Sequence, residues 1–118
     1  MQKMYTLAQG ARARQFGYIK ELEELTVYTG KDFSTAFCIF DSDIEDMLSY
    51  FCGKGWAVLG NQIDAVKFGG IGDYFKSVLK ESPKFASHIC AYLAENDRLL
   101  YRDDNGYLEF KVKQEGGE

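Results

Sequence analysis

The clearest hydrophobic pattern in the chain lies near its C-terminal end, after the only proline. Ser82 can cap a helix there, and Pro83 suits the first helical position because its missing N–H would have no helical partner. Asn96-Asp97 marks the end of this helix. Apolar residues at helical spacing predict one buried stripe, made of Phe85, Ile89, Tyr92 and Leu93.

The residues after this helix alternate around Asn105-Gly106, which favours a two-residue hairpin turn. Such a turn sets Tyr101 opposite Phe110 and Arg102 opposite Glu109. The same register sets Leu99 opposite Val112. One face of the predicted hairpin then collects its apolar side chains, which are Leu99, Tyr101, Leu108, Phe110 and Val112.

The N-terminal half of the chain is less regular. Residues 4–25 carry apolar side chains at roughly helical spacing, which predicts a helix that is firm from about Ala11 onward. Gly10 and Gly17 each oppose that helix by about 1 kcal/mol relative to alanine. β-branched and aromatic residues around Gly30 then predict a hairpin. Its second strand is apolar on both faces over 36–40, which predicts a central position in the sheet.

A second helix is predicted from Ser42 to about Gly53, because Ser42 and Glu45 match a capping box and further acids suit the positive end of the helix dipole. Glycine at 53 or 55 ends this helix. Its predicted buried stripe consists of Ile44, Met47, Leu48 and Phe51.

Short strands over 56–59 and 65–68 are predicted on either side of a Gly60-Asn61 turn. The glycines of 69–72 lack the spacing of a phosphate-binding loop, so they predict a hinge. A third helix follows over 73–81, and its expected buried residues are Tyr74 or Phe75, Val78 and Leu79.

These elements predict one α+β domain over residues 1–118, with a small antiparallel sheet and three to four helices. The helix-helix-hairpin order over 72–113 resembles the C-terminal part of a winged helix. The resemblance makes the helix from Pro83 the recognition helix and the hairpin the wing. The residues available to nucleic acid would be Lys76, Lys80, Lys84, His88 and Arg102.

The charge distribution disfavours direct binding of DNA. The net charge is −4, and residues 21–50 carry eight acids against one lysine. Asp46 and Cys52 stand where a calcium loop requires glycine and glutamate, which excludes that motif. The alternatives for the acids are solvated charges at a helix start and a protein-binding patch. The residues of this patch are Asp32, Asp41, Asp43, Glu45 and Asp46.

No catalytic, metal or cofactor motif is present in the sequence. Cys38, Cys52 and Cys90 are scattered, which predicts free and mostly buried thiols in a reducing compartment. His88 and Cys90 point to different faces of a helix, so they cannot form a nucleophile–base pair, and His88 is expected on the helix surface. The chain lacks a membrane-spanning run and a signal peptide, so a cytoplasmic location is expected.

The leading hypothesis is therefore a small non-enzymatic protein-binding module without a cofactor. Its partner would be another protein, such as a nucleic-acid-handling protein that it inhibits or regulates through the acidic residues. The alternative is a winged-helix transcriptional regulator that binds DNA through the basic residues.

Overall fold

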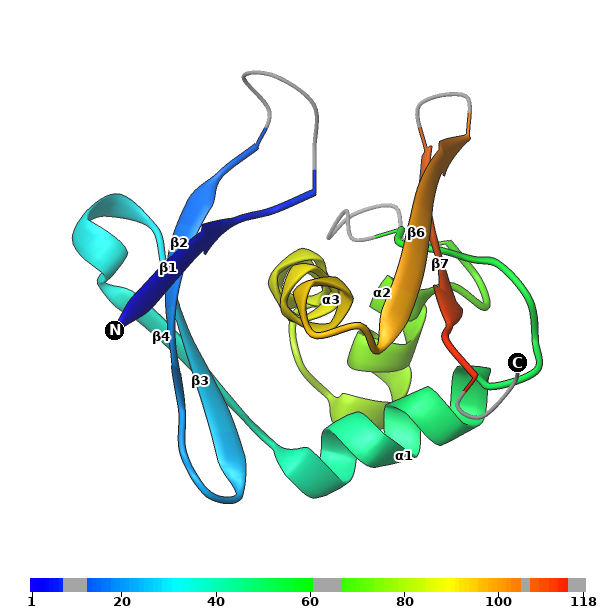
Figure 1. Ribbon diagram of the computed structural model, residues 1–118, viewed down its shortest axis with the longest axis horizontal. Coiled ribbons are helices and arrows are strands. Elements are labelled where there is room, and N and C mark those ends of the chain that lie inside the picture. The colour runs from blue at the N-terminus through cyan, green and yellow to red at the C-terminus, as the bar shows by residue number, and fades with distance from the viewer. Residues whose placement is uncertain (8–12, 61–66, 105–106, 115–118) are drawn as a thin grey trace.

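The computed structural model describes residues 1–7, 13–60, 67–104 and 107–114 (Figure 1). Over these residues the fold is α+β, with a four-stranded antiparallel sheet, a three-stranded antiparallel sheet and three α-helices. The first sheet has the order β1-β2-β3-β4, and its strands are β1 Gln2–Tyr5, β2 Gln15–Lys20, β3 Glu24–Thr29 and β4 Thr35–Phe40.

The predicted N-terminal helix over 4–25 is wrong, because β1 and β2 occupy this segment. The spacing that suggested a helix also fits a strand, since Phe16 and Tyr18 lie on one face of β2 and Ile19 on the other. Pairing with β3, whose residues lie further along the chain, decides the outcome. Lys20 accordingly pairs with Asp41 rather than with a residue one helical turn away.

The hairpin around Gly30 is confirmed as β3 and β4, joined through the 3-10 turn η2 at Lys31–Phe33. The predicted central position of β4 is wrong, because β4 is an edge strand. Phe37 and Ile39 are buried on its inner face, whereas alternate side chains are exposed on its outer face. The inner face packs on the helices, and the Phe37 ring stacks on Phe85 at 4.4 Å between centroids.

Helix α1 spans Asp41–Phe51, and its predicted stripe is buried. The predicted capping box is wrong. The helix begins directly at the end of β4, with Phe40 at the N-cap and no side-chain cap. The N–H of Asp41 donates to the Glu23 carbonyl at 2.9 Å. The first residue of α1 therefore still takes part in the hydrogen bonding of the sheet. Gly53 follows the helix end with φ of 80°, a conformation that favours glycine.

The second sheet has the order β5-β7-β6, with β5 at Ala57–Val58, β6 at Leu99–Asp104 and β7 at Tyr107–Val112. The predicted hairpin register is confirmed, since Tyr101 lies opposite Phe110 and Arg102 opposite Glu109. The Asn105-Gly106 turn lies outside the described residues. The strand predicted over 65–68 lies partly outside them, and Lys67 and Phe68 are not in a strand.

Helix α2 covers Ile71–Tyr74 and continues as the π-helical turn η3 at Phe75–Leu79. The prediction that Tyr74 or Phe75 is buried is confirmed, since both are, and Leu79 is partly buried. Val78 is exposed, against the prediction, because the π-turn rotates it away from the core. The helix predicted from Pro83 is confirmed. It starts with the 3-10 turn η4 at Pro83–Phe85 and continues as α3 at Ala86–Glu95.

Helix α3 lies between the first sheet and the β6–β7 hairpin (Figure 1). On one side the Tyr92 ring lies 5.0 Å from Tyr18 and the His88 ring lies 5.0 Å from Phe16. A helix that is apolar on several sides is typical of a protein interior. The buried residues of α3 are Ala86, Ile89, Cys90, Ala91 and Leu93.

None of the helices in the described part of the chain combines the length and the apolar character that crossing a bilayer requires.

Replacing Ala91 by leucine tests the central position of α3. Ala91 has no exposed surface, so the larger side chain should lower the free energy of unfolding by about 1–3 kcal/mol. Glu95→Leu, one turn later on an exposed position, should change it by less than about 0.5 kcal/mol. Urea unfolding monitored by circular dichroism measures both. Equal stabilities of the two variants would contradict the burial of α3.

Candidate functional site

The structure separates the predicted acidic residues into two groups. Asp41, Asp43, Glu45 and Asp46 lie in the first two turns of α1. Asp32 lies in η2, at the opposite end of β4. A six-residue strand is about 17–20 Å long, so Asp32 does not join the group on α1.

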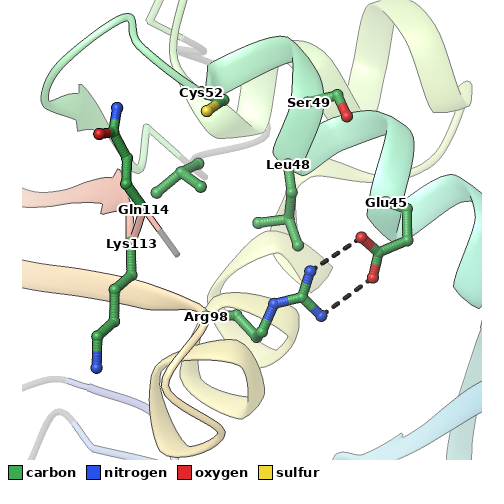
Figure 2. A pocket seen from close by; sticks show the side chains of 8 residues that line it. Glu45, Leu48, Ser49, Cys52, Arg98, Lys113 and Gln114 are labelled. Atoms are coloured by element: carbon green, nitrogen blue, oxygen red, sulfur yellow. Dashed lines mark hydrogen bonds and ion pairs between the residues drawn. The ribbon is translucent and has the colours of Figure 1, made fainter. Parts of the chain in front are cut away.

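Two of the carboxylates on α1 form ion pairs with other elements. Asp41 accepts from Lys20 Nζ of β2 at 2.9 Å. Glu45 accepts from both terminal nitrogens of Arg98, at 2.9 and 3.0 Å (Figure 2). Both pairs are solvent-exposed, so each stabilises the fold by at most about 1 kcal/mol. Their main effect is to neutralise these two acids locally.

Asp43 and Asp46 have no ion-pair partner among the residues that the structure describes. They lie near the buried Tyr74 on α2. Burial raises the pKa of the Tyr74 phenol, and the charges of Asp46 and Asp43 raise it further. The exposed Tyr50 ring lies 5.1 Å from the Tyr74 ring. We call Asp43, Asp46, Tyr50 and Tyr74 the α1 surface.

An open hollow of about 450 Å³ adjoins this helix (Figure 2). It is lined by Glu45, Leu48, Ser49, Cys52, Arg98, Val112, Lys113 and Gln114. Glu45 and Arg98 point toward each other, whereas Cys52 and Gln114 lie away from that pair. Both Glu45 oxygens accept from Arg98, so this carboxylate is already engaged in an ion pair. It is therefore a poor candidate for a general base.

The thiols are arranged differently from the prediction. Cys38 and Cys52 are exposed and only Cys90 is buried, so the prediction of mostly buried thiols is wrong. Cys38 is exposed because it lies on the outer face of an edge strand. Complete burial raises the pKa of the Cys90 thiol. Partial desolvation and the nearby Glu24 raise the pKa of the exposed Cys38 thiol, so neither is an activated thiolate.

Among the residues that the structure describes, no three histidine, cysteine or carboxylate side chains converge in a way that could hold a metal ion. The glycine-rich turn before α2 does not offer a free anion site either. Asp73 Oδ2 accepts from the Gly69 N–H at 3.0 Å, so a carboxylate already occupies that donor.

The basic residues of the winged-helix hypothesis lie on different elements. Lys76, Lys80 and Lys84 are exposed along the segment from η3 to η4. Arg102 lies on β6, where its Nε donates to Glu109 at 2.7 Å. Its guanidinium also lies 4.3 Å from the Trp56 ring. Arg102 is therefore already engaged within the fold.

His88 is not on the helix surface, because its ring lies against Phe16 of the first sheet and 6.2 Å from Phe85. Its Nδ1 is buried and has no hydrogen bond of full geometry to a described residue, and the backbone of Lys84 is the polar group that acts on the ring. Ala91, one turn later, is fully buried. The first sheet thus covers the side of α3 that would have to enter a DNA groove.

The histidine proton titration tests this burial directly. Burial lowers the pKa of His88 below its ordinary value of 6.5, and the charge of Lys84 lowers it too, while the Lys84 backbone carbonyl opposes the shift. Since His88 is the only histidine, one imidazole NMR signal reports it. The midpoint should lie below 6.5 in the folded protein and return to about 6.5 in urea.

The sign of the linked stability follows from the same shift. The unfolded chain binds the proton more readily, so His88 leaves stability unchanged well above pH 6.5 and reduces it as the pH falls below that value. A folded-state midpoint at or above the urea value would show that His88 is solvated.

Sequence reasoning missed the aromatic part of the α1 surface. The spacing of Asp46 and Tyr50, four residues apart on one helix, could have indicated Tyr50. No local signal indicated Tyr74, because α2 approaches α1 only through tertiary packing.

Comparison with known proteins adds no functional assignment, since no protein-family model, curated protein or solved structure matches the chain.

Proposed function

We propose that this chain is a non-enzymatic protein-binding module that contacts a basic region of another protein through the α1 surface. The observation that carries the proposal is the pair of carboxylates Asp43 and Asp46, which no described cation neutralises, beside the exposed Tyr50 ring.

The chemistry of the α1 surface suits an arginine-bearing partner. A guanidinium binds carboxylates through a planar fork of N–H donors and also stacks on aromatic rings. Lys54 already illustrates the second contact, since its Nζ lies 4.5 Å from the Tyr50 ring centre. Tyrosine and arginine are among the residues that contribute most to protein interfaces.

The buried stripe of α1 holds the helix in place, and two exposed ion pairs at its start make a small additional contribution. Lys20–Asp41 ties the helix to the first sheet, and Arg98–Glu45 ties it to the segment that joins α3 and β6. A surface that is held in place before binding loses little conformational entropy when a partner docks.

A nucleic-acid-handling protein is the partner class that the proposal favours. Such proteins present clusters of lysine and arginine that bind phosphates, and carboxylates on a rigid helix can occupy the same clusters. The net charge of −4 is consistent with attraction to a basic surface, and the outcome would be inhibition or regulation of that partner.

The alternative, a winged-helix DNA-binding regulator, is supported by the order of α2, α3, β6 and β7 and by the exposed lysines of η3 and η4. It is the weaker proposal, because His88 packs on Phe16 and Arg102 pairs with Glu109.

Charge reversal on α1 tests the proposed function. Asp43→Lys/Asp46→Lys should lose a partner that the unaltered protein retains in affinity capture from a cell extract, because two attractive charges become repulsive. Glu81→Lys/Glu95→Lys changes the net charge equally at exposed positions outside α1. This control should retain the partner. Equal loss from both variants, or no protein that distinguishes them, would contradict the proposal.

A gel shift with random-sequence duplex DNA separates the two functions. We expect no binding even at about 50 mM salt, where phosphate contacts are strong. Binding that falls steeply with salt and is weakened by Lys84→Glu would instead support the DNA-binding alternative. Asp32→Lys is the control, because it changes the charge in η2, away from the lysines of η3 and η4, and should not weaken such binding.

A further inference from the structure

The outer edge of β4 has unpaired backbone groups. Asp41 N–H donates to Glu23 O, which makes these residues a hydrogen-bonded pair of the antiparallel ladder. Such pairs alternate along the strands, so the N–H and C=O groups of Ala36, Cys38 and Phe40 point away from β3. Among the described segments, no backbone group hydrogen-bonds to those of Ala36 and Cys38 or to the Phe40 N–H. The Phe40 C=O differs, because at the N-cap it accepts the first hydrogen bond within α1.

This edge also lacks the features that prevent edge-to-edge association. Residues Thr35–Phe40 include no charge and no proline, and their pairing with β3 is continuous, without a bulge. The other edge of the sheet differs. β1 has only four residues, and Lys3 is among those whose backbone faces outward. The chain therefore protects one edge of the sheet and leaves the other open.

We propose that β4 pairs with β4 of a second copy of this chain, antiparallel about a two-fold axis at Cys38. The four strands of each copy then form one continuous eight-stranded sheet. A two-fold interface of this kind joins the same surface of both copies, which requires a strand that complements itself.

The β4 sequence meets this requirement. With Cys38 on the axis, Ala36 of one copy lies opposite Phe40 of the other, so a small side chain faces a large one on the outer face. Phe37 lies opposite Ile39 on the inner face, an aromatic–β-branched pair that stabilises sheets. No like charges meet along the paired residues, because the strand has none.

The exposed side chains favour a second copy over a peptide of unrelated sequence. Phe40 is 56% exposed, and Ala36 and Cys38 are exposed beside it. The copy supplies an equally long, uncharged edge with the same open backbone groups. Pairing satisfies the open backbone groups of both strands and brings their outward apolar side chains into lateral cross-strand contact.

The state of association tests the proposal by analytical ultracentrifugation over a roughly hundredfold range of protein concentration. At the upper end the protein should reach twice its chain mass of 13.4 kDa. Cys38→Lys should remain monomeric, because lysine on an edge strand opposes pairing. Ile19→Lys, on the same outer face but on the inner strand β2, should dimerise like the unaltered protein. Circular dichroism checks that both variants fold.

Cross-linking gives an independent measurement. Cys38 of the two copies should have Cα atoms about 5.5 Å apart, the spacing of a hydrogen-bonded antiparallel pair. A short bis-maleimide should therefore join Cys52→Ala chains through Cys38 and leave Cys38→Ala chains, which keep the exposed Cys52, unlinked. A monomer at every concentration, a dimer that survives Cys38→Lys, or a link through Cys52 would overturn the proposal. None of these outcomes depends on the α1 surface.

Discussion

The packing of α3 between the two sheets is the interaction on which the remaining structure depends. Small residues such as Ala86 and Ala91 let neighbouring elements approach the helix closely, and His88 and Tyr92 meet the rings of β2. Because α3 is part of the core, the side of it that could have bound a ligand is covered by the first sheet. The surfaces available for recognition lie on other elements.

Those surfaces belong to one continuous segment, β4 followed directly by α1. Among the described residues, the strand provides an edge without a pairing neighbour, and the helix provides carboxylates without an ion-pair partner beside an exposed ring. The exposed ion pair Lys20–Asp41 lies where the strand becomes the helix. Dimerisation through β4 would thus present two α1 surfaces in a fixed relation, and a partner with two basic regions would gain from binding both.

Local signals in the sequence predicted the C-terminal part of the fold well. The 3.6-residue period identified the buried stripe of α1, and the register predicted from Asn105-Gly106 agrees with the β6–β7 pairing. For the helix from Pro83 it identified the buried Phe85, Ile89 and Leu93, whereas Tyr92 is only partly buried. It missed Ala86, Cys90 and Ala91, because α3 is buried on several sides. The helix prediction for residues 4–25 failed because spacing such as that of Phe16 and Ile19 also fits a helix. Strand pairing, by contrast, depends on residues far along the chain. The edge position of β4 likewise depends on the tertiary arrangement, in which β3 is the one strand that pairs with β4 among the described residues.

The candidate site was predictable only in part. The acids of α1 are visible in the sequence, but their division into paired and unpaired groups is not. Glu45 is neutralised by Arg98, which lies 53 residues away, and Tyr74 reaches α1 only through the packing of α2. Counting acidic residues in the sequence therefore overestimated the unneutralised charge of the patch. The aromatic residues beside it could be identified only from the tertiary structure.

Amide hydrogen exchange measured by NMR tests the central position of α3 most directly. The account predicts that the amides of Ile89, Cys90 and Leu93 are among the slowest in the protein and exchange only when the whole chain unfolds. The amides of α1, which has one exposed side, should exchange faster. Exchange of the α3 amides at rates equal to or above those of α1 would show that α3 opens independently, and would contradict the account.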